Sequence, residues 1–60
     1  MTNDSMQQDM VNEYVGREVT FHGRWAVVED VYQDGSEPIV VIMDQEGEIY
    51  EIGFGRVNFI

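Results

Sequence analysis

The side chains of this 60-residue chain that could do chemistry are mostly carboxylates, with twelve Asp and Glu against three Arg. Eight of the twelve lie between Glu29 and Glu51, whereas each arginine follows a glycine outside that stretch. Carboxylates at this density can hold cations, act as acids and bases, or attract a basic partner. The eight candidates are Glu29, Asp30, Asp34, Glu37, Asp44, Glu46, Glu48 and Glu51.

Neither catalysis nor dedicated metal binding is predicted from these residues. His22 is the only histidine, and without a cysteine or suitably placed serine it forms no catalytic constellation, so we expect a solvated turn residue. Asp44, Glu46 and Glu48 alternate as calcium ligands can, but Gly47 falls at the fourth position of this run instead of the sixth. We therefore expect no enzyme, no cofactor and no metal site.

The net charge of −9 constrains the class of partner. It repels phosphate backbones and anionic lipid, so we expect no direct binding to nucleic acid or membrane. Carboxylates gathered on one side would instead attract a basic protein surface, and in the extreme case would imitate the charge of a nucleic acid. The alternative is a solubilising surface that also keeps edge strands apart.

Length and composition indicate one small soluble domain. A 60-residue domain buries only about 60% of its unfolded surface, so oligomerisation or partner binding would help stability. The chain has no cysteine, which excludes disulfides and makes a reducing cytoplasm the expected location. No secretion signal is evident near the start, and the longest apolar run, Ile39 to Met43, is too short to span a membrane.

A short helix is predicted over residues 5–15, after a disordered stretch over residues 1–4. Ser5 begins a capping-box spacing, and Gly16 stands where a helix terminator is expected. The apolar stripe of this helix is expected to plug one end of the strand region, or alternatively to form an adaptable docking surface. Its main residues are Met6, Met10 and Tyr14.

From residue 16 to residue 60 the pattern becomes that of strands separated by tight turns. Alternation slips at Glu29 and Asp30, which predicts a β-bulge, and Asp34-Gly35 predicts a turn. The run from Ile39 to Met43 is apolar on both faces and is expected to be the central strand. Five short strands favour a small closed barrel, which removes exposed edges. The predicted strands cover residues 17–21, 25–32, 39–43, 48–52 and 57–60.

This pattern resembles the SH3-like small barrels, a group that includes Tudor, KOW and Sm-like domains, and the resemblance covers residues 14–60. The expected fold class is therefore mainly β, a five-stranded SH3-like barrel preceded by a short N-terminal helix, and such a helix is particularly Sm-like. The residues that carry the resemblance are small or apolar, and they describe architecture more than function. They are Val15, Gly16, Val19, Ala26, Val28, Val31, Gly47 and the closing stretch 57–60.

The resemblance brings two further expectations. Tudor-like readers bind methylated cations in aromatic cages, although rings in small domains usually pack in the core, and Trp25 is expected beneath the helix. Sm-like subunits form homo-oligomeric rings around nucleic acid, a ligand that the charge of this chain repels. The candidate cage residues are Trp25, Tyr32, Tyr50 and Phe54.

Together these features predict a small, acidic, non-catalytic protein-binding module. It would be a regulator or inhibitor of the kind that phages and mobile elements encode, docking its carboxylates on a basic surface of a nucleic-acid-handling protein. The alternatives are an Sm-like or structural homo-oligomeric subunit and a Tudor-like reader of cationic peptides. Besides the eight carboxylates, the predicted contact residues are Met6, Met10, Tyr14, Trp25, Tyr32 and Tyr50.

Overall fold

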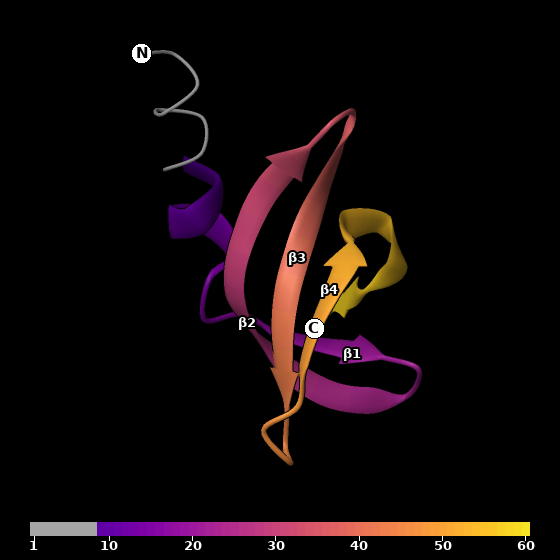
Figure 1. Ribbon diagram of the computed structural model, residues 1–60. Helices are drawn as coiled ribbons and strands as arrows, with labels where there is room; N and C mark the ends of the chain where they lie inside the picture. Colours follow the sequence, from indigo (N-terminus) through magenta and orange to yellow (C-terminus); the bar gives the residue numbers. More distant parts are fainter. Residues whose placement is uncertain (1–8) are drawn as a thin grey trace.

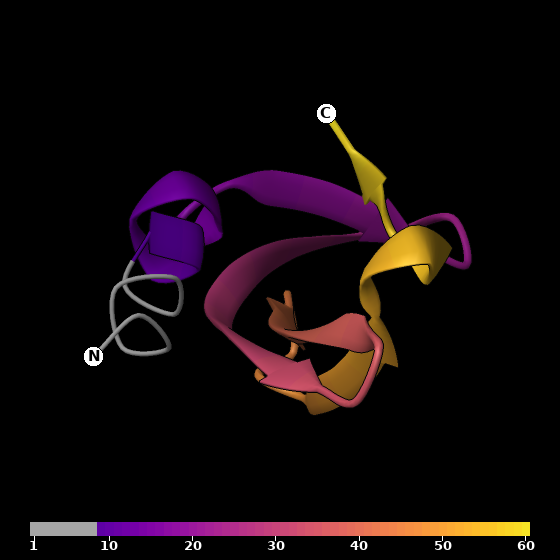
Figure 2. The ribbon, with the colours of Figure 1, turned by 90° about the horizontal axis from the view of Figure 1, so that it is seen from above.

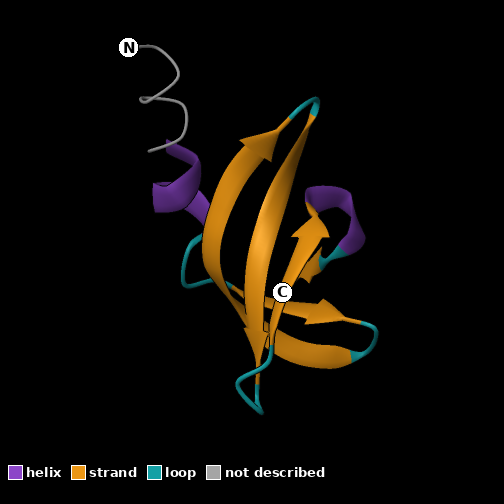
Figure 3. Cartoon of the chain, in the orientation of Figure 1, coloured by secondary structure: helices purple, strands orange, loops and turns teal. Residues whose placement is uncertain are grey.

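The structure is a computed structural model that describes residues 9–60. Within them the chain is mainly β, with one antiparallel sheet in the order β4-β3-β2-β1-β5 (Figure 1). Residues 9–14 form the one short α-helix, called the helical segment below (Figure 3). The other elements are β1 (Glu18–Phe21), β2 (Arg24–Asp34), β3 (Glu37–Asp44), β4 (Ile49–Gly53), the 3₁₀ turn η1 (Phe54–Arg56) and β5 (Asn58–Phe59).

The predicted bulge in the second strand is confirmed. The register of β2 against β3 shifts between Val28 and Asp30, so the extra residue returns Val31 to the face that Val28 occupies. The Asp30 carboxylate accepts a hydrogen bond from the Val31 backbone N–H at 2.8 Å. The strand bends as it passes from β1 to β3, and the sheet curls around the core (Figure 2).

The core lies on the concave face of this curled sheet. Val31, Val40 and Ile52 are cross-strand neighbours there and are buried. Met10 and Tyr14 of the helical segment pack against the same core, which is the first of the two roles predicted for them. The buried apolar residues are Val19, Ala26, Val28, Val31, Val40, Ile42, Ile52 and Val57.

The helical segment ends as its sequence predicts. Gly16 has a φ of 92°, a conformation that favours glycine, and its N–H donates to the Val28 carbonyl at 2.9 Å. The turn therefore ties the helical segment to β2. Met6, the predicted disordered stretch 1–4 and the start of the predicted helix lie outside the described residues.

The sheet is open, so the predicted closed barrel is not confirmed. β4 pairs only with β3, and β5 pairs only with β1. Because β5 has two residues and follows η1, it forms no ladder with β4. The second and third strands are longer than predicted because pairing continues to Asp34 and Glu37, on both sides of a two-residue turn. No helix in residues 9–60 has the length and apolar character needed to cross a bilayer.

Candidate functional site

The eight predicted carboxylates do not all belong to the surface. Seven of them are exposed, but Asp44 is buried, with 7% of its surface accessible. Asp44 is therefore not part of the exposed acidic surface. A carboxylate that loses its water must find donors in the protein, and the β3–β4 turn supplies them.

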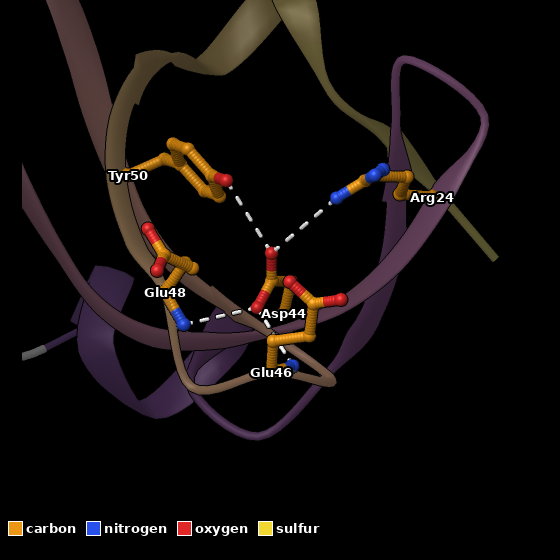
Figure 4. Close-up of polar contacts among 5 residues, drawn as sticks. All are labelled: Arg24, Asp44, Glu46, Glu48 and Tyr50. Carbon is orange, nitrogen blue, oxygen red and sulfur yellow. Dashed lines mark hydrogen bonds and ion pairs between the residues drawn. The ribbon is translucent and has the colours of Figure 1, made fainter.

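Asp44 organises the turn between β3 and β4 (Figure 4). Its Oδ1 accepts hydrogen bonds from the backbone N–H groups of Glu46 and Glu48, each at 2.9 Å. Its Oδ2 accepts a bond from the Tyr50 hydroxyl at 3.3 Å and lies 4.0 Å from Nη1 of Arg24. Glu46 and Glu48 thus contribute backbone donors here, while their own side chains remain exposed.

These donors set the ionisation of Asp44. Burial by itself raises the pKa of a carboxyl group, but here it is outweighed by the backbone N–H groups of Glu48 and Glu46. The Tyr50 hydroxyl and the Arg24 charge act in the same direction, and the pKa of Asp44 is lowered from its ordinary value. Asp44 is therefore an ionised structural residue at neutral pH.

The face of the sheet opposite the core, called the outer face below, carries exposed apolar side chains. Side chains alternate between faces along a strand, and Val40 and Ile42 point into the core. Their neighbours on β3 therefore point outward, and Met43 lies between Val27 of β2 and Ile49 of β4. Ile49 is 53% exposed, and Trp25, on the same face of β2, is 39% exposed.

Carboxylates flank these apolar side chains. Asp30 on β2 and Glu51 on β4 lie on either side of Val41 in one cross-strand row. Glu18 on β1 pairs with Val27, and its Oε1 accepts a hydrogen bond from Trp25 Nε1 at 3.1 Å. The outer face is thus an apolar surface with acids on both sides.

Glu51 also accepts a hydrogen bond from the Tyr32 hydroxyl at 2.7 Å. This bond, together with burial and the charge of Glu51, raises the pKa of Tyr32. Tyr32 belongs to β2 and faces outward, next to Ile39. The bond fixes the position of one outer-face carboxylate.

Two of the three arginines lie beside carboxylates. Arg17 forms an ion pair with Glu13 at 3.3 Å and lies over the Tyr14 ring at 5.8 Å. Arg24 lies against Asp44. It therefore partly neutralises the negative charge of the acidic segment 29–51, although it lies outside that segment in the sequence. Neither of these two arginines forms an ion pair with Glu18, Asp30 or Glu51 of the outer face.

The four predicted cage residues do not form one cluster. No ring contact joins any two of Trp25, Tyr32, Tyr50 and Phe54 in the described chain. Trp25 is not packed beneath the helix, since it is exposed and bonded to Glu18 on the outer face. Trp25 precedes the buried Ala26 and Val28 in the alternation of β2, so its side chain points away from the core.

Other rings do meet. Tyr14, Phe54 and Phe59 contact one another with centroids 5.1 to 5.4 Å apart, which joins the helical segment to η1 and β5. The ring centroid of Phe21 lies 4.2 Å from that of His22 and 6.1 Å from that of Tyr50. His22 itself is an exposed turn residue.

The second ring cluster borders an apolar pocket of about 230 Å³ at the end of the sheet where the β1–β2 and β3–β4 turns meet. Asp44 and Arg24 line this pocket and also a neighbouring hollow that reaches Trp25 and Glu46. Sequence reasoning missed the roles of Phe21 and His22 because the pocket depends on which turns become neighbours. The lining residues are Phe21, His22, Arg24, Ala26, Ile42, Asp44 and Tyr50.

Comparison of the chain with protein-family models, with curated proteins and with solved structures found no match. In residues 9–60 no three His, Asp or Glu side chains are arranged to hold a metal ion. The outer face and the pocket are therefore the two features from which a function can be argued.

Proposed function

We propose that this protein is a non-catalytic binding module that docks its exposed carboxylates, those of the outer face together with those of the adjoining turns, on a basic surface of a protein partner. The observation that carries the proposal is the placement of charge. Seven exposed carboxylates lie between Glu29 and Glu51 without an arginine among them. Charge of one sign on one surface accelerates encounter with a partner of the opposite sign and selects against like-charged molecules.

The partner is proposed to be a protein that handles nucleic acid. Such proteins carry clustered Lys and Arg for phosphate contacts, and these clusters complement the outer face. Small acidic regulators of the phage or mobile-element type, working in the cytoplasm, fit this description. The attraction would weaken with added salt because exposed charges are screened over about 8 Å at physiological ionic strength.

We also propose that the sheet has an SH3-like arrangement. It is supported by the order β4-β3-β2-β1-β5, by the bulged and bent second strand, and by the single turn η1 before the last strand. A helix preceding these strands also fits the resemblance. An SH3-like module would use the sheet as a rigid base for its binding surface.

The pocket favours a second candidate, a reader of cationic peptides. Its apolar walls include the Phe21 and Tyr50 rings, and an ionised carboxylate, that of Asp44, lies at its border. Cations are attracted both to carboxylates and to ring faces. Nη1 of Arg24 already lies 4.0 Å from Oδ2 of Asp44. A cationic side chain of a partner would therefore have to take the place of Arg24 beside this oxygen.

The leading proposal predicts that binding depends on where charge is reversed. In affinity purification from host lysate at low salt, the wild-type protein should enrich identifiable basic proteins. Glu46→Lys with Glu48→Lys should remove them, because both side chains are exposed and neither makes a structural bond. The control, Asp4→Lys with Asp9→Lys, changes the net charge equally outside the acidic segment and should retain the partners.

Equal loss in both double variants would show that net charge alone governs capture. Retention of the basic partners by the Glu46 and Glu48 variant would contradict the proposal. Circular dichroism of each variant checks that the sheet is intact.

A further inference from the structure

The outer face has a centre of six apolar side chains, which we call the apolar stripe. Three of them follow β3, and the others flank it on β2 and β4. The helical segment and η1 send Tyr14 and Phe54 to the core instead, on the opposite side of the sheet. The apolar stripe consists of Trp25, Val27, Ile39, Val41, Met43 and Ile49.

The apolar stripe is accessible in spite of its composition. Ile49 and Trp25 rank among the exposed large apolar residues, and the other four are half-buried by their neighbours. Contiguous exposed apolar surface on a small soluble protein marks interaction sites more often than isolated apolar residues do. The three carboxylates Glu18, Asp30 and Glu51 border it.

We propose that the apolar stripe is the docking site for a basic amphipathic helix of a protein partner. The inference rests on the proposed function and adds the shape of the partner. Apolar residues of the helix would lie along β3, and its flanking Lys or Arg would reach Asp30 and Glu51. Recognition of this kind combines an apolar seam with charged flanks.

The dimensions of the surface fit a helix. Neighbouring strands lie about 4.8 Å apart, so β2 and β4 are separated by roughly 10 Å. This is close to the diameter of an α-helix with its side chains, about 10 to 12 Å. Because the outer face is the convex side of the curled sheet, β2 and β4 slope away on either side of a helix placed along β3, and the long side chains of its flanking Lys or Arg would reach down to Asp30 and Glu51.

Charge complementarity selects this occupant over a second copy of the chain. In a symmetric dimer the same surface meets itself, which would bring Glu18, Asp30 and Glu51 against their own counterparts. The ion pairs of Arg17 with Glu13 and Arg24 with Asp44 hold these cations elsewhere. A partner with Lys or Arg beside its apolar residues satisfies both components of the surface.

The test uses two synthetic peptides of roughly 15 residues, with the same numbers of Leu and Lys. One places every Leu on a single helical face, and the other has the same residues in shuffled order. The emission of Trp25, the single tryptophan, reports contact with the apolar stripe. We expect the amphipathic peptide to shift this emission to the blue and to bind at least about tenfold more tightly than the shuffled one.

Ile49→Ser should weaken binding of the amphipathic peptide by about fivefold, since Ile49 is half exposed before docking and has about half its transfer free energy left to gain. Val15→Ser is the matched control, because Val15 is 40% exposed in the turn before β1. It should leave the affinity unchanged.

Three other results would overturn the inference. Equal affinity for both peptides would mean that charge alone binds, and the proposed function would survive without the apolar stripe. Binding of neither peptide would remove both. Sedimentation showing self-association of the protein that Ile49→Ser abolishes would assign the apolar stripe to a second copy.

Discussion

Ile42→Ala is expected to remove about half of the stability of the protein. Ile42 is 1% exposed at the centre of the core, and replacing a buried isoleucine by alanine costs about 2 to 5 kcal/mol. A 60-residue domain has a total stability of only roughly 3 to 9 kcal/mol. The loss is therefore a large fraction of the whole stability, and urea unfolding followed by circular dichroism measures it.

Ile49→Ala is the matched control for this prediction. It makes the same change on the neighbouring strand, but Ile49 is 53% exposed and faces away from the core. We expect a loss below about 1 kcal/mol. Similar losses at the two positions would contradict the assignment of inner and outer faces.

Asp44→Ala is expected to lower the melting temperature by several degrees, and Asp44→Asn by less. Alanine leaves the backbone N–H groups of Glu46 and Glu48 without their acceptor, whereas the Oδ1 of asparagine can still accept both bonds. The difference in melting temperature between Asp44→Ala and Asp44→Asn measures the contribution of the hydrogen bonds. The difference between Asp44→Asn and the wild type measures the contribution of the charge. Thermal unfolding of both variants beside Glu48→Gln, which removes a charge from an exposed side chain, makes the comparison.

The stabilisation by Asp44 is expected to depend on pH. Folding lowers the pKa of Asp44 from its ordinary value of 3.8. The ionised carboxylate therefore stabilises the fold fully at pH values above 3.8. This stabilisation is lost as the pH falls through the lower pKa of the folded state. The difference in melting temperature between wild type and Asp44→Asn should thus be present above about pH 5 and shrink below pH 3.8. A difference independent of pH would contradict the ionised, hydrogen-bonded carboxylate.

Local patterns predicted most of the fold. The slip at Glu29 and Asp30 located the bulge, and Asp34-Gly35 located the turn between β2 and β3. Gly16 located the end of the helical segment. These features follow from conformational preferences of a few adjacent residues. Closure of a barrel depends instead on pairing between β4 and β5, which are joined through η1, and no local pattern decides it.

The candidate site was less predictable than the fold. Asp44 has the same sequence signature as its exposed neighbours Glu46 and Glu48, and only the β3–β4 turn distinguishes it by directing two N–H groups at its carboxylate. Trp25 was expected beneath the helix because aromatic rings in small domains usually pack in the core. The outer face did leave a signal, since a run that is apolar on both faces, Ile39 to Met43, must present Ile39, Val41 and Met43 away from the core.

The central claim, that the acidic outer face binds a basic partner, is tested most directly by nuclear magnetic resonance of the complex with the amphipathic Leu and Lys peptide. We expect intermolecular Overhauser contacts to the methyl groups of Val27, Met43 and Ile49 on the outer face. Contacts confined to the pocket, at the methyl groups of Ala26 and Ile42, would contradict the claim and favour the reader of cationic peptides.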